Sequence, residues 1–576
     1  MVELEQLKGI VTRYLELHPR DASRIELLGE MLQKADDSNQ VCLRSCRVGH
    51  VTASALVICP ESNRILLVNK PAWKRHLQPG GHLLEEDDSP LSAAQRHLKW
   101  RLGDAFVDML EYVQFDYDSL IPIDIDSHSV PASGADGEPR HKHFDFRYVF
   151  FIEDEDMLSQ DTDFFRKHQP KWFDLQYLQA LNSFNFVIPR IQQIGAQHVR
   201  RRRFFGDVIA NCKGMEVSTI PVVHVIPDVP DYLRSLRQCT NVLGVLAKPK
   251  SIDDSTRSML EDEGFSISVF TRNSAEQFDY LDEQIANSPG AVVLLDIGGC
   301  FSKQIEPLAK KHGNKLIGVV EDTENGLQKY LDASPWPVPV FSAARSPLKE
   351  HEDFLIGQSI VFSTDALLRD CGSLLQYANC SVIGYGKVGS SIAHHLIMRG
   401  ISPNVFEEDP QRQLMAYNRN CQVQSWKRLL NCSDVLFSAT GNQALELSDF
   451  RQLKNGCFVT SVTSSDDEFD FSFLRSEYQE EAVTENVVRL TGEHNYFHLL
   501  NDGNAPNFLH GAVVGDFIHL VRAEMLTCVS EIVELVADKG INGAAQSQPL
   551  SLSDFHRDRI LKCWLRTFTD RRWPET

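Results

Sequence analysis

Three glycines at a fixed spacing are the most specific chemical feature of the sequence. Gly384, Gly386 and Gly389 form a Gly-x-Gly-x-x-Gly pattern between an apolar run that begins at Ser381 and a helical run that ends at Met398. The first glycine permits a tight turn, the second lets the backbone approach a pyrophosphate, and the third lets a helix pack on a strand. The N–H groups that open the helix then face the anion. The pattern therefore predicts a dinucleotide site.

A carboxylate follows these glycines at the offset expected for contact with a ribose. Glu407 comes directly after a second predicted strand, about 20 residues beyond the glycine pattern. A carboxylate at this position binds ribose hydroxyls and repels a 2′-phosphate, so the sequence favours NAD over NADP. The alternative is a glycine-rich turn in an α/β fold that binds no ligand.

The part of the chain from about Pro230 to Val536 resembles S-adenosylhomocysteine hydrolase. Besides the glycine pattern, the resemblance rests on the segments 295–299, 318–326, 438–442 and 499–507. In that family a bound NAD oxidises the 3′-hydroxyl of the substrate's ribose, which makes the proton on C4′ acidic. The 5′ substituent is then eliminated, water adds, and the hydride is returned. The resemblance implies NAD as the cofactor and a nucleoside-type substrate.

The resemblance also implies a set of site residues. Lys349 and Asp353 match the family's lysine and aspartate near the oxidised hydroxyl, and Asp322 stands where a glutamate binds the ribose. The residues implied for NAD are Gly384, Gly386, Lys387, Val388, Gly389, Glu407, Thr323, Asn325, Thr440, Asn442 and Asn507. Without the resemblance, Lys349 and Asp353 would be interpreted as a solvated i, i+4 ion pair on a helix.

Several positions depart from the family pattern at residues that would exchange protons. They are Lys248, Ile297, Phe354, Ser464 and Asp516, where the family has histidine, aspartate, asparagine, histidine and histidine. The C-terminal lysine and tyrosine that reach a neighbouring subunit's NAD in the family have no counterpart here. Two hypotheses remain. One is an NAD-containing enzyme that acts on a ribose-type substrate, and the other is a catalytically inactive protein that senses nucleotides.

A second resemblance, to a branch of the Nudix hydrolases, lies in the amino-terminal part of the chain. It rests on the segments 50–55, 77–82, 124–128 and 141–147. Nudix enzymes hold Mg²⁺ with glutamates of one helix, but the helix expected at 91–102 has His97, Trp100 and Arg101 at those positions. The sequence therefore predicts a Nudix-like domain that lacks metal-dependent hydrolysis and binds a nucleotide or a partner protein.

Two other polar groups of this domain, a pair of histidines and an acidic segment, could bind a ligand or metal or could be purely structural. His141 and His143 lie two residues apart in an expected strand, so both point to one side and either contact a ligand or form a half-buried polar edge. The acidic residues 85–88 favour a solvated loop over a metal site. Thirteen cysteines are scattered without the spacing of metal ligands. We therefore expect no metal site.

Charge and composition exclude several classes of protein. The 576 residues include 58 Lys and Arg against 79 Asp and Glu, a net charge of −21 that disfavours nucleic-acid binding. We interpret the basic run Arg200 to Arg203 as a solvated helix face or linker rather than a phosphate-binding patch. No apolar run is long enough to cross a membrane, and the first residues lack the features of a signal peptide. We expect a cytoplasmic protein with a small nucleoside or nucleotide ligand and, from the family, a homo-oligomer.

The order of the expected helices and strands predicts a multidomain chain. An α+β Nudix-like domain is followed by α/β doubly wound Rossmann-type domains. The predicted parts are a helical lead-in (1–45), the Nudix-like domain (46–180), a linker (181–229), a substrate-type domain (230–360 and 500–545), a Rossmann NAD-binding domain (361–499) and a C-terminal helical tail (546–576). Strands are expected at 53–59, 64–68, 106–115, 144–152, 242–246, 266–270, 291–296, 315–320, 381–384, 403–407, 434–438 and 457–462, and a loop at 127–140.

Overall fold

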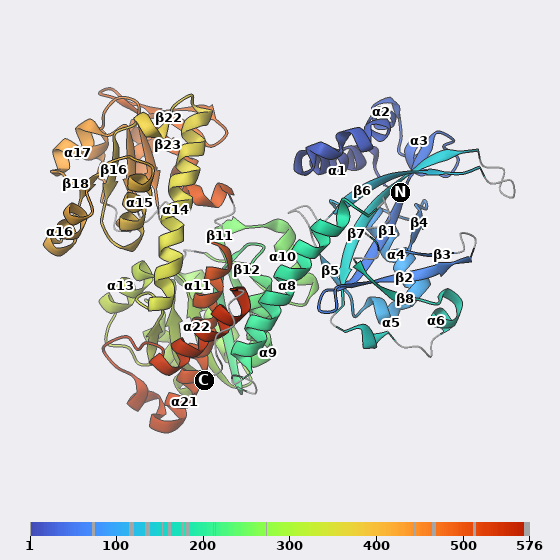
Figure 1. Cartoon of the computed structure of the whole chain (residues 1–576). Helices are drawn as coiled ribbons and strands as arrows, with labels where there is room; N and C mark the ends of the chain where they lie inside the picture. The colour runs from blue at the N-terminus through green and yellow to red at the C-terminus, as the bar shows by residue number, and fades with distance from the viewer. Residues whose placement is uncertain are drawn as a thin grey trace. The chain divides into compact units, whose positions relative to one another are not determined.

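The computed structural model of the chain describes residues 2–71, 75–113, 120–132, 139–152, 154–158, 163–175, 178, 184–210, 212, 215–271, 274–441, 444–462, 468–469, 471–510 and 514–569. The chain forms two compact units. Unit 1 comprises Met1–Arg203 with Asp253–Ser258, and unit 2 comprises Phe204–Ile252 with Met259–Thr576. Figure 1 labels many of the helices and strands of both units. Among the described residues, no helix is long and apolar enough to cross a membrane.

Unit 1 is built on one mixed sheet. Its strands are β1 (Gly49–Cys59), β2 (Arg64–Lys70), β3 (Arg75–Leu77), β4 (Gly80–His82), β5 (Glu111–Val113), β6 (Asp124–Val130), β7 (His141–Phe151) and β8 (Lys171–Asp174). Across the sheet the order is β3-β2-β1-β7-β5, with β4 paired to β1, β6 to β7 and β8 to β2. The helices are α1 (Leu4–Leu17), α2 (Glu26–Lys34), α3 (Asn39–Cys42), α4 (Pro90–Leu102), α5 (Asp104–Val107), α6 (Asp163–His168) and α8 (Val187–Ile209), the last of which ends in unit 2.

The alternation of side chains along β7 gives this sheet an apolar face and a polar face. Phe144, Phe146 and Tyr148 are buried in a core that also contains Ala94 and Leu98 of α4. Successive side chains of a strand point to opposite faces, so the residues between these aromatics share the other face. That face therefore carries His141, His143, Asp145 and Arg147.

Two predictions for unit 1 are wrong. Residues 106–115 do not form one strand, since Asp104–Val107 is the helix α5 and only Glu111–Val113 is extended, while 114 and 115 lie outside the described residues. The loop predicted at 127–140 begins too early, because Ser127–Val130 completes β6. Strand β6 pairs antiparallel with β7, and this long-range pairing outweighs the turn-forming composition of the segment.

Unit 2 contains two doubly wound sheets. The first sheet has β9 (Val217–Val225), β10 (Asn241–Val242), β11 (Val245–Ile252), β12 (Ile267–Val269), β13 (Ala291–Asp296), β14 (Leu316–Glu321) and β15 (Val340–Ser342). Its order is β12-β11-β9-β13-β14-β15, with β10 beside β9, and its strands pair in parallel. The earlier strands therefore lie on one side of β9 and the later strands on the other side.

The second sheet repeats this arrangement. It has β16 (Cys380–Ile383), β17 (Asn404–Phe406), β18 (Gln422–Val423), β19 (Val435–Ser438), β20 (Cys457–Ser461), β21 (Gln479–Thr484), β22 (Val487–Thr491) and β23 (Tyr496–Leu500). Its order is β18-β17-β16-β19-β20-β23-β22-β21, in which β22 runs antiparallel to both of its neighbours. Parallel strands that wind in both directions from the first strand define a Rossmann-type domain, so the predicted α/β architecture is confirmed.

The helices of unit 2 connect and cover these sheets. They are α9 (Pro230–Cys239), α10 (Asp254–Asp262), α11 (Ser274–Asn287), α12 (Ile305–His312), α13 (Glu324–Asp332), α14 (Pro347–Asp370), α15 (Lys387–Met398), α16 (Pro410–Asn418), α17 (Trp426–Cys432), α18 (Leu447–Phe450), α20 (Phe471–Glu477), α21 (Ile518–Ala544) and α22 (Asp554–Phe568). Helix α10 begins in the segment that belongs to unit 1. Figure 1 shows α14, in yellow, as one long helix, and it leads from the first sheet of unit 2 to the second.

The linker predicted at 181–229 is wrong in its second half. Residues Val217–Val225 form β9, the strand from which the first sheet winds in both directions. A strand in that position is covered on both faces, and all but one residue of β9 is buried. The prolines and the arginine run of the surrounding sequence are not typical of a strand, so the local composition did not indicate one. The strand forms because it pairs with distant partners in the sheet.

Candidate functional site

The topology of unit 2 brings the candidate residues to the carboxyl ends of its strands. In doubly wound sheets, ligands bind outside these ends, where the strand order reverses. The reversal lies between β9 and β13 in the first sheet and between β16 and β19 in the second. We therefore expect the ligand-binding site at the loops that follow these strands.

The glycine loop follows β16 and has the geometry that its pattern predicts. Gly384 has a φ of +87°, and a side chain there would meet the carbonyl oxygen of Ala439 at 2.8 Å. A side chain on Gly389 would lie 2.1 Å from the carbonyl oxygen of Gly384, so the helix packs directly on the loop. Gly386 precedes α15 without a side-chain cap, and a Cβ there would meet only Arg412, at 4.0 Å. The N-terminus of α15 is thus left accessible at Gly386.

Glu407 lies at the entrance to this loop, directly after β17. Its Oε2 accepts a hydrogen bond from the backbone N–H of Tyr385 at 2.7 Å. Its Oε1 accepts from the N–H groups of Glu408 at 2.9 Å and Asp409 at 3.0 Å. A carboxylate has about four acceptor positions, so the three amides fix its orientation and leave capacity for a ribose hydroxyl.

Lys387 and Val388, the first residues of α15, have structural contacts. The Lys387 Nζ donates to the carbonyl oxygen of Ala344 at 2.6 Å and lies 3.4 Å from Oδ2 of Asp353. Val388 is half-buried and packs against the core of the second sheet. These contacts join the helix of the glycine loop to the beginning of α14.

The beginning of α14 places Lys349 inside the protein. Ser346 caps the helix by accepting from the N–H of Leu348 at 3.2 Å, and a proline occupies the first helical position. Lys349 therefore lies in the first turn, where its Nζ is 3.0 Å from Oδ1 of Asp322 and 3.0 Å from Oε2 of Glu352. All three side chains are buried. The solvated pair of Lys349 with Asp353 is not formed, because Asp353 pairs with Lys387 instead.

The charges of this cluster determine the protonation of Lys349 and Glu352. Burial alone lowers the pKa of the Lys349 ammonium, but the carboxylates of Asp322, Glu352 and Asp353 raise this pKa above its ordinary value. Burial raises the pKa of Glu352, and the charges of Asp322 and Asp353 add to this effect against the opposing charge of Lys349. The cluster therefore holds a firmly protonated ammonium beside a carboxyl group that protonates more readily than usual.

Two titratable groups near this cluster, the half-buried His224 and the buried Glu524, were missed by the sequence analysis. His224, at the end of β9, has its Nδ1 2.5 Å from Oγ of Ser251. Burial lowers the pKa of His224 to about 3, and the charges of Lys248, Arg522 and Lys349 act in the same direction. Burial raises the pKa of Glu524, on α21, to about 7. A polar residue at the carboxyl end of an apolar strand is the signal that could have identified His224.

Thr323 and Asn325, at the start of α13, have different roles. The Thr323 hydroxyl donates to Glu321 at 2.7 Å and accepts from the N–H of Gly326 at 3.0 Å, so it caps the helix. Asn325 lies beside Gly441 in the loop after β19, since a side chain on that glycine would meet Cγ of Asn325 at 3.7 Å. Asn325 is therefore brought next to the glycine-loop domain, as its predicted role requires.

Thr440 and Gly441 are held by a carboxylate that the sequence analysis did not identify. The buried Glu468 accepts from the hydroxyl of Thr440 at 3.1 Å, from the hydroxyl of Ser438 at 2.6 Å and from the N–H of Gly441 at 2.6 Å. These bonds fix the loop opposite the glycine turn. Asn442, the next predicted residue, lies outside the described residues.

Asn507 provides a test of whether the residues of this region fit a dinucleotide. It lies in the short helix Pro506–His510 and is buried. Within the part of the chain that the structure describes, its Oδ1 has no hydrogen-bond partner. A buried acceptor of this kind is normally satisfied, so Asn507 is suited to accept from a bound ligand. This acceptor, the uncapped helix at Gly386 and the carboxylate of Glu407 together fit NAD.

A family model matches the second sheet of unit 2 and its surroundings. Residues 355–508 match the family model of the S-adenosyl-L-homocysteine hydrolase NAD-binding domain. The apo-structure of D-lactate dehydrogenase from Escherichia coli is similar at 16% identity, covering 46% of this chain and 79% of that chain, with a TM-score of 0.27. The TT0316 protein of Thermus thermophilus is similar at 11% identity, covering 45% of this chain and 78% of that chain, with a TM-score of 0.27. The domain at residues 355–508 is therefore Rossmann-type and similar to the NAD-binding domain of S-adenosyl-L-homocysteine hydrolase, and NAD is the cofactor of this protein.

Proposed function

We propose that unit 2 uses NAD to oxidise, reversibly, a secondary hydroxyl group of a ribose-type ligand. The observation that carries this proposal is the buried contact of Lys349 with Asp322 and Glu352. In this cluster, Lys349 lies one helical turn before Asp353, which pairs with Lys387 at the start of the glycine-loop helix. The groups that would hold a hydroxyl are therefore connected to the groups that would hold NAD.

Each residue of the cluster has a definable chemical task. Two N–H groups of the Lys349 ammonium donate to Asp322 and Glu352, and the third can donate to the oxygen of a ligand hydroxyl. Its raised pKa keeps this group protonated, so it stabilises negative charge on that oxygen rather than accepting a proton. Glu352 is the group suited to accept the hydroxyl proton, since its pKa lies closer to neutrality. When bound, NAD would supply the acceptor for the hydride of the carbon that carries the hydroxyl.

A ribose-type ligand is supported by the number of carboxylates in the cluster. Carboxylate oxygens accept hydrogen bonds, and neighbouring hydroxyls of a sugar supply the donors. Asp322, Glu352 and Asp353 are all buried near Lys349. The resemblance to S-adenosylhomocysteine hydrolase supports the same ligand class, with the sugar of a nucleoside as its part nearest Lys349.

A second candidate function is the sensing of nucleotides without turnover. One observation favours it. Ile297 follows β13 at the carboxyl edge of the first sheet and packs partly into the apolar core, so it provides no proton acceptor there. Such a protein would retain the binding of NAD and of the nucleoside but would not complete the later proton transfers.

The absorbance of reduced nicotinamide distinguishes these functions. Full-length protein is loaded with NAD and mixed with adenosine-type nucleosides, and the near-ultraviolet spectrum is recorded. We expect reduced nicotinamide with the wild type and with Lys310→Met, an exposed lysine on α12, and none with Lys349→Met. Nucleoside binding without reduced nicotinamide in the wild type would support sensing. Absence of NAD binding would overturn both functions.

A further inference from the structure

The polar face of the sheet in unit 1 gathers histidines from separate strands. Strands β1 and β7 pair in parallel with His50 opposite His143, and β6 pairs with β7 so that His128 is also opposite His143. His141 lies two residues before His143 and shares its face. His82, on β4, has its ring centroid 5.0 Å from that of His50 and 5.2 Å from that of His143. Five imidazole rings thus occupy one small region.

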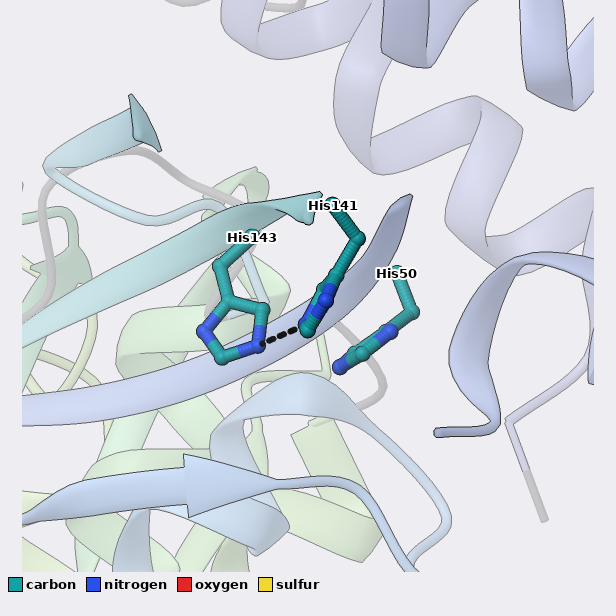
Figure 2. A group of neighbouring side chains, drawn as sticks. All are labelled: His50, His141 and His143. Carbon is teal, nitrogen blue, oxygen red and sulfur yellow. Dashed lines mark hydrogen bonds between the residues drawn. The ribbon is translucent and has the colours of Figure 1, made fainter. Parts of the chain in front are cut away.

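Three of these rings converge closely enough to hold one metal ion. One nitrogen each from His50, His141 and His143 lies within 4.8 Å of the other two. Figure 2 shows the rings of His141 and His143 joined at their Nε2 atoms, with a ring nitrogen of His50 directed toward His141. His50 and His141 are buried, and His143 is half-buried. The positions of these three rings are therefore fixed by the buried strands of the sheet.

The distance between two of the nitrogens fits shared coordination. Nε2 of His141 lies 3.1 Å from Nε2 of His143. Two nitrogens bound to one tetrahedral zinc ion, each at 2.0–2.1 Å, are separated by about 3.3 Å. The Nδ1 of His141 donates to the carbonyl oxygen of Pro139 at 2.8 Å, which leaves the lone pair of the neutral ring on Nε2. His141 is therefore already in the tautomer that presents Nε2 to a metal.

The surroundings of the rings resemble the outer shell of a metal site. Metal-binding histidines usually donate their second N–H to a carbonyl or carboxylate, which orients the ring. His141 does so to Pro139, and Nδ1 of His50 lies 3.4 Å from the carbonyl oxygen of Cys46. On the same face, Asp145 follows His143 by two residues and accepts from Thr52 at 3.0 Å. Its carboxylate also lies 3.5 Å from the guanidinium of Arg147, which balances its charge.

The ligand atoms determine which metal is accepted. Imidazole nitrogen suits zinc and the neighbouring transition metals, whereas magnesium and calcium require oxygen. We propose that His50, His141 and His143 form a binding site for a Zn²⁺-class transition-metal ion with an open fourth position. This differs from the expectation of no metal site, which considered His141 and His143 but not His50. The proposal does not depend on the function proposed for unit 2.

The open position indicates what the ion would do. Three protein ligands with one remaining position are typical of catalytic zinc, whereas structural zinc has four protein ligands. Access is available from the side of His128, whose side chain is 43% exposed and whose ring centroid lies 5.5 Å from that of His143. The fourth position would take water or an oxygen of a small ligand, such as a phosphate or carboxylate group.

Metal titration of the full-length protein tests the proposal. After dialysis against a chelator, the protein is titrated with Co²⁺, whose visible spectrum reports coordination geometry, and then with Zn²⁺ as a competitor. Metal content is measured by mass spectrometry. We expect one equivalent of metal, a four-coordinate Co²⁺ spectrum and displacement by Zn²⁺. His50→Gln, His141→Gln and His143→Gln should each weaken binding by at least about tenfold.

The control variant is His76→Gln, which changes a histidine of β3 outside the cluster. It should bind metal as the wild type does. Circular dichroism verifies the fold of each variant, and the Co²⁺ spectrum of the wild type remains decisive where a variant does not fold. Binding of much less than one equivalent by the wild type, a six-coordinate spectrum, or unchanged affinity in folded cluster variants would overturn the proposal.

Discussion

Asp353 and Lys387 form an ion pair that connects two helices of unit 2, with Oδ2 and Nζ 3.4 Å apart. Asp353 lies on α14, one turn after Lys349, and Lys387 is the first residue of α15 after the glycine loop. Lys387 also donates to the carbonyl oxygen of Ala344 at 2.6 Å. The contact therefore joins the helix that would receive a pyrophosphate to the helix that carries the buried lysine.

A double-mutant cycle measures the strength of this connection. We expect Asp353→Ala and Lys387→Ala to be coupled by about 1 kcal/mol in the free energy of unfolding, because Asp353 is largely shielded from water. Chemical denaturation of the two single variants and the double variant gives the value. The matched control is the exposed pair of Arg451 and Glu477, for which we expect about 0.5 kcal/mol or less. Equal coupling in the two cycles would contradict the connection.

Glu407→Ala should weaken the binding of NAD. The variant removes a charged acceptor at the entrance to the glycine loop, a change that costs about 1.5–3 kcal/mol and corresponds to about a ten- to hundredfold loss of affinity. Calorimetric titration with NAD measures the effect. Glu408→Ala, which changes the exposed neighbour, should bind NAD like the wild type. Equal affinity of the two variants would show that Glu407 does not contact the cofactor.

Gly386 and Gly389, the second and third glycines of the pattern, should respond differently to substitution by alanine. Gly389→Ala places Cβ against the backbone oxygen of Gly384 and should lower the free energy of unfolding by about 1–3 kcal/mol or more. Gly386→Ala meets only Arg412 at 4.0 Å, so its stability should stay near that of the wild type while NAD affinity falls. Thermal denaturation and calorimetry separate the two effects. A destabilised Gly386→Ala variant would contradict this division.

Glu524 should make unit 2 less stable as the pH rises. Burial raises the pKa of this carboxyl from 4.5 to about 7. Between these values the folded state binds more protons than the unfolded state, so stability is full at low pH and is lost as the pH rises through the folded pKa. Glu524→Gln keeps a neutral side chain and should remove this loss, which is worth a few kcal/mol at about 1.4 kcal/mol per pKa unit.

Denaturation at about pH 5 and about pH 8 tests this prediction. The change in unfolding free energy between the two conditions should be smaller for Glu524→Gln than for the wild type. Glu350→Gln, on the exposed side of α14, serves as the control and should follow the wild type. A parallel pH dependence of Glu524→Gln and the wild type would refute the role of Glu524.

Asn507→Leu should raise the stability of the protein without ligand and lower its affinity for NAD. The buried Oδ1 has no partner among the described residues, a state that costs about 1–3 kcal/mol in the unliganded fold, and leucine removes that cost. The same substitution removes an acceptor for the cofactor. Thermal melts with and without NAD show both effects, and Asn431→Leu, on an exposed position of α17, provides the comparison. Loss of stability without loss of affinity would assign Asn507 a structural role.

Comparison of the predicted strands with those of the structure shows which strands are specified by their own local sequence. The strands expected at 291–296, 381–384 and 434–438 agree closely with β13, β16 and β19, because apolar β-branched runs bounded by turn residues specify buried parallel strands. Strands β6 and β9 were missed, since their sequences contain polar residues or proline and become extended only through pairing with distant partners.

The sequence by itself predicted the cofactor and the segment expected to bind it, because the turn, the helix start and the acid of a dinucleotide fold lie within one βαβ segment at fixed offsets. Only the tertiary structure decided the surroundings of Lys349. Its ammonium pairs with Asp322, which follows β14, whereas Asp353 pairs with Lys387. The tertiary structure also decided the histidine cluster, whose third member, His50, comes from another strand than His141 and His143. The physical reason is that the register between strands far apart in the chain sets these distances, and no spacing along the sequence encodes that register.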